Sequence, residues 1–340
     1  MEKKLNLAVI GTGRMGSIHT RNVARLIPGA NLVALCDLRL ELAQALADEL
    51  DVPSVTRDYH HLLADPDIDA VMIITNTDTH AAIIRDCAEA GKHIFCEKPI
   101  ALDLHAIDEA LAAVKKAGIK LQIGFNRRFD KNFRKVREVT ASGAFGRPCI
   151  LKIVNRDPEL PAMNFLRSSG GMFLDMSIHD FDMARFQIGE VEELYAVGSV
   201  LVDDELKTFG DIDTSLVTLK FANGAIGNID NSRQSVYGYD QSLEVFYLNG
   251  TARADNEQES TVMVADRVGM HHAKPPYWFI NRYAECYVEE VRQFVDAVLN
   301  DKAVPVTGED GRAAVVLGYA AWKSFKENRP VNIKDFLQSL

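Results

Sequence analysis

The sequence predicts an α/β protein in which a parallel-sheet domain is followed by an α/β domain with a large, mostly antiparallel sheet. The length of 340 residues exceeds the size to which one hydrophobic core usually grows. Up to about residue 125, short apolar runs alternate with helix-length segments, and longer strands with turn signals follow. We therefore expect one domain at residues 1–125 and a second at residues 126–340.

The first domain is predicted from apolar runs that are typical of fully buried strands. Continuous apolar runs separated by helical segments indicate βαβ units and a parallel sheet. The runs are LNLAVIG, ANLVALCD, AVMIIT, HIFCEK and LQIGF. We expect a doubly wound sheet, in which ligands bind beyond the carboxyl ends of the strands.

The second domain is predicted from longer strands with alternating or mixed faces. RPCILKIV, DTSLVTLKFANGAIGNIDN and QSLEVFYLNGTARADN are the clearest of these strands. Two of them contain Asn-Gly, at Asn223-Gly224 and Asn249-Gly250, which is the strongest short-range signal of a hairpin. Helices are expected at about residues 171–187, 282–299 and 312–327.

Charge and cysteine content argue against several classes of protein. The net charge is -10 and no basic run is present, so nucleic acid and anionic membrane surfaces are poor partners. No apolar stretch approaches the roughly 20 residues that span a bilayer. MEKKLNLAVIGTG lacks the apolar region of a signal peptide. Five cysteines without CxxC spacing indicate reduced thiols, so we expect a cytoplasmic protein.

The turn after the first strand has the spacing of a dinucleotide-binding loop. Gly11, Gly13 and Gly16 stand in the order GxGxxG between a strand and a helix. Glycines there permit a tight turn, close approach of a pyrophosphate to backbone N–H groups, and packing of the helix on the strand. Arg14 and Met15 complete the motif and belong to the predicted cofactor site.

A carboxylate at the end of the second strand indicates which dinucleotide binds. Asp37 ends LVALCD about 20 residues beyond the glycines, where a carboxylate accepts hydrogen bonds from ribose hydroxyls. An aspartate there repels a 2′-phosphate, which favours NAD. Arg39 could contact such a phosphate, so NADP stays open as the alternative.

Two further polar features point to catalysis. Glu97-Lys98-Pro99 follows the strand HIFC, at the end of the sheet where ligands bind. SGGMFLDMSIHDFDMARF places Asp175, His179 and Asp182 at helical spacing. The apolar stripe beside these three, which we expect to pack inward, is Leu174, Ile178, Phe181 and Ile188.

These residue types suit the oxidation of a secondary alcohol. Histidine has an ordinary pKa of about 6.5, so His179 could accept the hydroxyl proton near neutral pH. Asp175, four residues earlier on the same expected helix, would hold one nitrogen of the imidazole ring. Lys98 would stabilise negative charge on the reacting oxygen, and its use as the base stays open. Asp182 is expected to be structural.

The same polar residues also have the spacing of a possible metal site. Asp175, His179 and Asp182 could ligate a metal from one helix face. No further histidine or cysteine with ligand spacing stands near them in the sequence, and nicotinamide chemistry needs no Lewis acid once Lys98 is present, so we expect none. His271-His272 is expected in a solvated turn, and Cys96 in a buried strand.

Three motifs, taken in order along the chain, resemble the Gfo/Idh/MocA oxidoreductase family. They are GTGRMG, Glu97-Lys98-Pro99 and Gly170-Gly171-x3-Asp175-x3-His179-x2-Asp182. Within the family, the phrases GFNRRFD, NRDP, DMSIHDFDMARF and YGYDQ are most similar to the inositol 2-dehydrogenases. The resemblance implies that NAD is used to oxidise myo-inositol to 2-keto-myo-inositol (scyllo-inosose).

The resemblance also implies an architecture and a set of roles. The first domain would be a Rossmann domain, and the open sheet of the second would pack in a homotetramer. Lys98 would bond the reacting oxygen, and Asp175 with His179 would handle its proton. The loop at residues 75–80 would touch the nicotinamide, with Asn76 standing where many family members have proline. The cofactor contacts implied around these positions are Thr75, Asn76, His80, Glu97 and Lys98.

A cyclic polyol also requires polar side chains that recognise its hydroxyl groups. The candidates by resemblance and position are Asn126, Arg127, Asn155, Asp157, Tyr237 and Tyr239, of which Arg127 and Tyr237 are preferred. The alternatives are an enzyme for another cyclic polyol or sugar, such as scyllo-inositol or an aldose, an NADP-dependent reductase, and a non-catalytic NAD-binding regulator.

Overall fold

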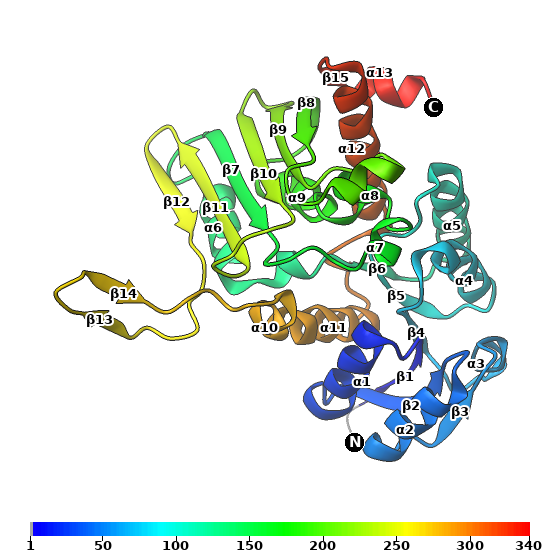
Figure 1. Cartoon of the computed structure of the whole chain (residues 1–340). Helices are drawn as coiled ribbons and strands as arrows, with labels where there is room; N and C mark the ends of the chain where they lie inside the picture. Colours follow the sequence, from blue (N-terminus) through cyan, green and yellow to red (C-terminus); the bar gives the residue numbers. More distant parts are fainter. Residues whose placement is uncertain (1–2) are drawn as a thin grey trace. The chain divides into compact units, whose positions relative to one another are not determined.

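The computed structural model describes residues 3–340 and divides into two compact units. The first unit extends to Asn126 and also includes Glu285–Ala313, and the second comprises Arg127–Ala284 and Ala314–Leu340 (Figure 1). The chain thus leaves the first unit close to the boundary expected at residue 125. The sequence did not indicate that a later segment returns to it. Met1 and Glu2, which open the stretch assessed for a signal peptide, lie outside the described residues.

A six-stranded parallel sheet forms the centre of the first unit, as predicted. Its order is β3-β2-β1-β4-β5-β6, which is the order of a Rossmann fold with its reversal beside β1. The sequence predicted every strand except the short β3. The strands are β1 (Leu5–Ile10), β2 (Ala30–Cys36), β3 (Ser54–Thr56), β4 (Ala70–Ile73), β5 (His93–Glu97) and β6 (Leu121–Gly124).

Helices with one apolar side cover this sheet. They are α1 (Arg14–Leu26), α2 (Leu40–Leu50), α3 (His60–Ala64), α4 (Thr77–Glu89), α5 (Leu104–Ala117) and α11 (Ala284–Leu299). The last of them explains why Glu285–Ala313 belongs here. Val291, Phe294 and Val295 recur at helical spacing on α11 and join Leu7 of β1 in one buried apolar cluster.

The second unit contains a seven-stranded sheet that is mostly antiparallel, as predicted. Its order is β12-β11-β7-β10-β9-β8-β15, and only β7 and β10 pair in parallel. Both Asn-Gly pairs lie in hairpin turns, between β9 and β10 and between β11 and β12, which confirms that prediction. The strands are β7 (Pro148–Arg156), β8 (Val191–Ser199), β9 (Thr214–Phe221), β10 (Ile226–Ser232), β11 (Asp240–Tyr247), β12 (Gly250–Ala254) and β15 (Val331–Asn332).

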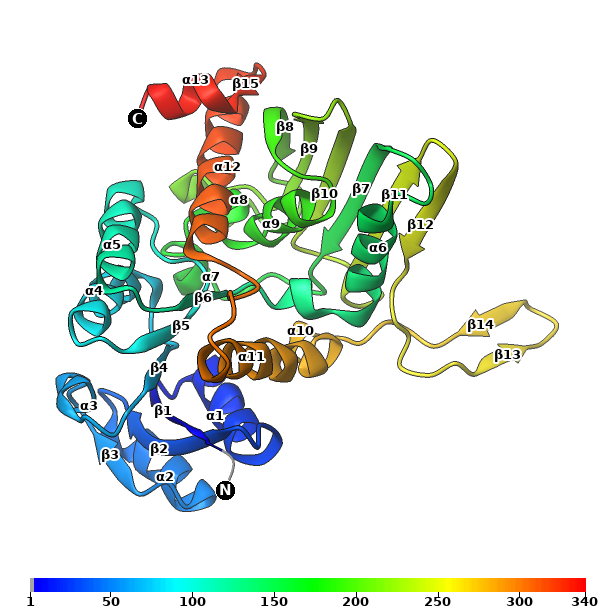
Figure 2. The ribbon, with the colours of Figure 1, turned by 180° about the vertical axis from the view of Figure 1, so that it is seen from behind.

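One face of this sheet is covered and the other is open. Helices α6 and α9 lie over the covered face (Figure 2). On the other face Val197, Leu216, Ile226 and Phe246 are each at least 40% exposed. The helices and short 3-10 turns of this unit are η1 (Asn126–Phe129), α6 (Lys131–Ser142), α7 (Met163–Leu166), α8 (Gly171–Asp175), α9 (Ile178–Gln187), η2 (Asp204–Phe209), α10 (Phe279–Arg282), α12 (Gly308–Glu327, from Ala314 onward) and α13 (Ile333–Gln338).

The helix predicted at residues 171–187 is in fact two helices. α8 ends at Asp175 and α9 begins at Ile178. Between them the Ser177 N–H donates to the Met172 carbonyl, five residues back, and the Ser177 hydroxyl donates to Asn231 of β10 at 2.6 Å. The expectation that Asp175 and His179 share one helix was therefore wrong. The expected apolar stripe is buried, as predicted: Leu174, Ile178, Phe181 and Ile188.

Three smaller predictions can be compared directly. His271 and His272 are solvent-exposed, but they lie in β14 (Met270–His272), which pairs with β13 (Met263–Ala265) in a separate hairpin, and not in a turn. Cys96 is fully buried in β5, and burial raises the pKa of its thiol well above the ordinary value. The five cysteines are free thiols. Among residues 3–340 no helix is long and apolar enough to cross a bilayer.

Candidate active site

The glycine turn of the first unit is shaped by close backbone contacts. Gly11 has φ +95°, and a Cβ there would lie 2.4 Å from the Ile74 carbonyl oxygen. A Cβ at Gly16 would lie 2.0 Å from the Gly11 carbonyl oxygen. At Gly13 a Cβ would meet nothing within 4 Å. Two glycines are therefore needed to build the turn, whereas the third leaves space beside it.

That space lies at the N terminus of α1. Gly13 is the N-cap residue, and no side chain caps the helix there. The first N–H groups of such a helix form a site for an anion, which in a dinucleotide is the pyrophosphate. Arg14 is exposed and Met15 half-buried in the first turn, so the predicted motif residues surround this helix end.

We expect Gly13→Ala to weaken NAD binding without destabilising the fold. The open space at Gly13 accepts a methyl group, but that methyl group obstructs the approach of the pyrophosphate, so the Kd for NAD should rise at least about tenfold, or about 1.4 kcal/mol. Titration calorimetry and thermal unfolding would measure the two effects. Gly16→Ala is the contrasting variant, because its Cβ clash should lower the Tm. Unchanged NAD affinity in Gly13→Ala would contradict the assignment.

Asp37 lies at the end of β2, and its carboxylate is fixed by the glycine turn. Oδ2 accepts hydrogen bonds from the Thr12 N–H at 2.7 Å and the Thr12 hydroxyl at 2.8 Å. Oδ1 accepts from the Arg39 N–H at 2.9 Å. Burial opposes ionisation, but these hydrogen bonds and the Arg39 charge outweigh it, so the pKa of Asp37 is lowered. Asp37 is thus an oriented anion, as a ribose-binding carboxylate should be.

The loop after β4 is tied to the segment that carries Lys98. His80 is 1% exposed; its Nδ1 lies 2.9 Å from the Pro99 carbonyl oxygen and its Nε2 lies 3.1 Å from the Thr75 carbonyl oxygen. The Thr75 hydroxyl pairs with that of Thr79 at 2.6 Å, and Asn76 is exposed as the N-cap residue of α4. His80 is therefore placed to fix the loop more than to contact a ligand itself.

Lys98 directly follows the carboxyl end of β5. Its side chain is half-buried, and the peptide bond to Pro99 is cis. The Lys98 N–H donates to Glu97 Oε2 at 3.2 Å. The carboxylate of Glu97 is thus in contact with the backbone of the residue that we predict to act in catalysis.

In the second unit, Asp175 ends α8 and is paired with a buried arginine. Arg233, which follows β10 and is 0% exposed, donates from Nη1 to Asp175 Oδ2 at 3.2 Å. Sequence reasoning missed Arg233, because no spacing pattern links it to Asp175. The half-buried Asp157 lies near both; burial and the Asp175 charge raise the pKa of Asp157 to about 6, although Arg233 opposes the shift.

His179 is half-buried in the first turn of α9, next to a buried polar network. The centre of the network is Asp180, which is 0% exposed. Its carboxylate accepts from Arg127 Nη1 at 2.7 Å, Asn155 Nδ2 at 2.7 Å and Asn231 Nδ2 at 2.8 Å. Arg127 and Asn155, both predicted to bind substrate, are therefore buried and hydrogen-bonded within the protein. The sequence did not single out Asp180.

Asp182 is buried and paired, which agrees with its expected structural role. Both of its carboxylate oxygens accept from Arg128, with Nη2 to Oδ1 at 2.6 Å and Nε to Oδ2 at 2.9 Å. The side chain of Asp182 is 1% exposed and that of Arg128 is 9% exposed, so water cannot easily replace a lost partner.

We expect Asp182→Asn to destabilise the protein, because the amide cannot accept both guanidinium hydrogen bonds and leaves a buried charge uncompensated. The free energy of unfolding should fall by about 2 kcal/mol. Thermal unfolding would show a lower Tm. Asp204→Asn is the matched control, since its ion pair with Lys207 is exposed. Equal Tm values for the two variants would contradict the structural role.

The remaining substrate candidates differ in exposure. Asn126 is 3% exposed and Tyr239 is 4% exposed, and the Tyr239 hydroxyl accepts from Arg127 at 3.1 Å. Tyr237, in contrast, is 42% exposed. Its hydroxyl donates to Asp240 and accepts from Arg156 at 3.1 Å. Among the predicted substrate residues Tyr237 therefore offers the most accessible aromatic ring.

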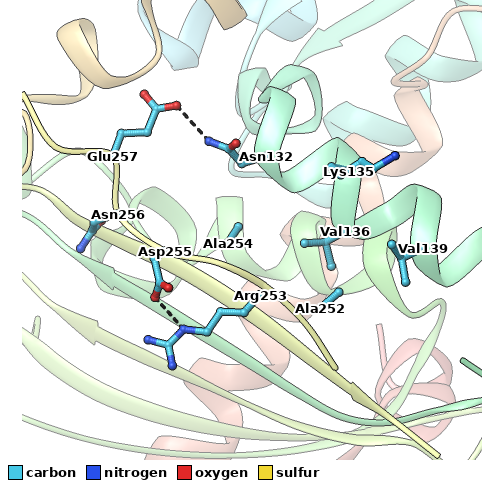
Figure 3. A pocket seen from close by; sticks show the side chains of 10 residues that line it. All are labelled: Asn132, Lys135, Val136, Val139, Ala252, Arg253, Ala254, Asp255, Asn256 and Glu257. Atoms are coloured by element: carbon cyan, nitrogen blue, oxygen red, sulfur yellow. Dashed lines mark hydrogen bonds and ion pairs between the residues drawn. The ribbon is translucent and has the colours of Figure 1, made fainter. Parts of the chain in front are cut away.

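A cavity of about 490 Å³ in the second unit lies away from these residues. Figure 3 shows it between α6 and β12, where Asn132 donates to Glu257 at 2.9 Å and Arg253 to Asp255 at 2.6 Å. None of the predicted site residues lines it. The predicted chemistry therefore does not depend on this cavity.

Comparison with known families decides the classification. Residues 5–125 match the model described as an oxidoreductase family with an NAD-binding Rossmann fold, and residues 133–253 match that of the GFO/IDH/MocA C-terminal domain. The chain belongs to the Gfo/Idh/MocA family. It is an NAD-dependent oxidoreductase that acts on CH–OH groups, as the motifs predicted.

Individual members of the Gfo/Idh/MocA family match along nearly the whole chain. The myo-inositol 2-dehydrogenase of Thermotoga maritima is 46% identical over 334 residues, covering 98% of this chain and 100% of that protein. The scyllo-inositol 2-dehydrogenase (NAD(+)) of Bacillus subtilis is 36% identical over 334 residues, covering 98% and 97%. The structure of myo-inositol dehydrogenase from Lactobacillus casei with NAD(H) and myo-inositol superimposes with a TM-score of 0.88 at 28% identity, covering 97% and 96%.

Proposed function

We propose that this family member is an inositol 2-dehydrogenase that oxidises myo-inositol to 2-keto-myo-inositol (scyllo-inosose). The observation that supports this best is the 46% identity to the Thermotoga maritima myo-inositol 2-dehydrogenase over essentially both full lengths. Lys98, Asp175 and His179 are all present, which a protein that only binds NAD has no need to keep. NAD, when bound, supplies the acceptor for the hydride that leaves the ring carbon.

The protein's own residues would manage the proton and the charge on oxygen. His179 takes the hydroxyl proton as the C–O bond becomes a carbonyl, and passes it to solvent. Asp175, which pairs with Arg233, would orient the imidazole ring of His179. Lys98 stabilises the negative charge that develops on the oxygen. Each group thus acts on a different part of one oxidation.

The second unit, which contains most of the predicted domain at residues 126–340, would bind the polyol. Tyr237 is the substrate contact that the structure supports best, because its ring is exposed while Arg156 and Asp240 fix its hydroxyl. Asn126, Arg127 and Asn155 stay proposed substrate residues. Arg127 and Asn155 already donate to Asp180, so their proposed contacts with substrate would use the donors that this network leaves over.

Initial rates with different polyols would test the substrate. We expect the highest kcat/KM for myo-inositol with NAD. Glucose or xylose as the substrate, or NADP as the cofactor, should give a lower kcat/KM. The similarity to the Bacillus subtilis enzyme makes scyllo-inositol the second candidate. A higher kcat/KM for scyllo-inositol would make scyllo-inositol the proposed substrate. NAD binding without turnover of any polyol would favour a regulator.

The open face of the second sheet supports the proposal of a homotetramer. Phe246, Ile150 and Ile226 are aligned across three neighbouring strands, and Val197 is aligned with Leu216. Exposed apolar residues grouped in this way are typical of protein–protein interfaces. Light scattering on the purified protein would give four times the mass of the chain, and a monomer would refute the assembly.

We also propose that the enzyme works in the cytoplasm. The support is that all five cysteines are free, four of them buried. Reduced thiols are typical of proteins that stay in a reducing compartment. Fractionation of cells that produce the protein would test the assignment.

A further inference from the structure

Three titratable side chains form a buried cluster beside Lys98 in the first unit. His19 comes from α1, Glu97 from the end of β5, and Glu290 from α11. One nitrogen or oxygen atom from each lies within 4.8 Å of the others. His19 and Glu290 are 0% exposed, and the Glu97 side chain is 14% exposed. Burying so many titratable groups is costly unless they are paired, hydrogen-bonded or uncharged.

Glu97 is held at both carboxylate oxygens. Oε1 lies 2.7 Å from His19 Nε2, and Oε2 accepts from the Lys98 N–H at 3.2 Å. The carboxylate lies against Gly124 of the neighbouring strand, where a Cβ would come within 3.1 Å of it. Because any larger residue at this position would crowd the carboxylate, Gly124 gives Glu97 the room it occupies.

Glu290 is in a different state from Glu97. Among residues 3–340 neither of its carboxylate oxygens has a hydrogen-bond partner, and Oε1 lies 3.9 Å from His19 Nε2. Gln122 of β6 donates only to the Glu290 main-chain carbonyl, at 2.8 Å. The titratable groups that face Glu290 are therefore His19 and Glu97. Burial, and then the charge of Glu97, raise the pKa of Glu290 well above its ordinary value.

The same three residues could be considered as metal ligands, but the distances favour a hydrogen bond. Two ligands of a tetrahedral metal, each at about 2.1 Å from it, lie about 3.4 Å apart. His19 Nε2 and Glu97 Oε1 are separated by 2.7 Å, which is a hydrogen-bond distance. A metal would have to push this pair apart inside a closed core.

We propose that Glu290 is kept as a neutral acid so that Glu97 carries the only negative charge of the cluster, and that Glu97, tied to His19, positions Lys98 for catalysis. The inference rests on the catalytic role proposed for Lys98. A second negative charge on Glu290 would repel Glu97 and loosen its contact with the Lys98 backbone. Glu97 and Glu290 are thus positioning residues that act through Lys98.

The protonation of Glu290 can be tested through stability. The folded protein holds a proton on Glu290 that the unfolded chain releases above about pH 4.3. The free energy of unfolding of the wild type should therefore fall, relative to Glu290→Gln, as the pH rises from there towards the raised pKa. We expect the Tm of the variant minus that of the wild type to grow with pH. If this Tm difference did not change with pH, the proposal that Glu290 is a neutral acid would be overturned.

The positioning role can be tested through kinetics. Glu97→Gln removes the charge that holds His19, so we expect kcat to fall about tenfold, or about 1.4 kcal/mol, and to fall by a larger factor than any change in the Kd for NAD. Ionisation of Glu290 at high pH should disturb Glu97 and lower the kcat of the wild type. We expect this alkaline decline to be weaker in Glu290→Gln. Glu289→Gln is the control, because Glu289 lies on the same helix with its side chain 29% exposed, and it should match the wild type.

The outcomes separate this inference from the proposed function. If Lys98→Met keeps its turnover, the catalytic role of Lys98 fails, although the pH-dependent Tm difference can still hold. If Lys98→Met loses turnover but Glu97→Gln keeps a normal kcat, only the positioning role is overturned. If the purified wild type contained one equivalent of a divalent metal and Glu290→Gln did not, the cluster would be a metal site and the proposal would be overturned.

Discussion

Lys98→Met should retain NAD but turn over myo-inositol about 100- to 1,000-fold more slowly than the wild type, the usual cost of removing one group that stabilises an oxyanion. Methionine has nearly the length of lysine but no charge. The ammonium group of Lys98 matters only when negative charge develops on the reacting oxygen. Its loss should therefore destabilise the transition state. The effect should appear in kcat, measured from NADH absorbance, and hardly in the Kd for NAD.

Lys115→Met provides the matched control for this substitution. Lys115 is exposed in the last turn of α5, so the same change of side chain should leave both constants unaltered. Lys98→Arg adds information, because it keeps the charge but changes the shape of the group. Normal turnover in Lys98→Met would show that the oxygen is stabilised by another residue.

His179→Ala should lower kcat about 100- to 10,000-fold, the range that a positioned general base contributes. Alanine cannot accept the hydroxyl proton, so the alcohol must lose it directly to water. The wild type should also lose activity at acidic pH as the imidazole of His179 becomes protonated and can no longer act as a base. The variant should lack this part of the pH profile, which initial rates at constant ionic strength would reveal.

The control for His179→Ala is His105→Ala. His105 is on α5, with its side chain 81% exposed, and should affect neither kcat nor its pH dependence. A wild-type acid limb that persists in His179→Ala would assign the titration to a different group. Asp157 would then be the first to examine, because its pKa is raised to about 6 near Asp175.

Much of the fold could be predicted because local patterns determine it. Buried parallel strands need continuous apolar runs, and the tight turns of the second sheet need Asn-Gly, so strands and hairpins were visible in the sequence. The glycine turn could be predicted for a similar reason. Gly11 and Gly16 leave no room for a Cβ, and such a requirement is recorded directly in the residue type.

The rest depended on contacts between distant residues. The helix breaks after Asp175, where Ser177 donates to Asn231, 54 residues away, and periodicity within the segment could not reveal that contact. The pairing of Asp175 with Arg233 spans 58 residues. Asp180 looked like one more charge on a helix, and only the fold shows that two asparagines and an arginine converge on it.

The return of α11 to the first unit decides how the protein can be divided. A fragment that ends near Asn126 would contain every strand of the parallel sheet but would lack Val291, Phe294 and Val295, which are part of its apolar core. It would also lack Glu290. The first unit therefore cannot be separated from the rest of the chain by one cut after Asn126. Anyone who exchanges substrate domains between relatives must graft both Arg127–Ala284 and Ala314–Leu340, and keep the host's own Glu285–Ala313 between them.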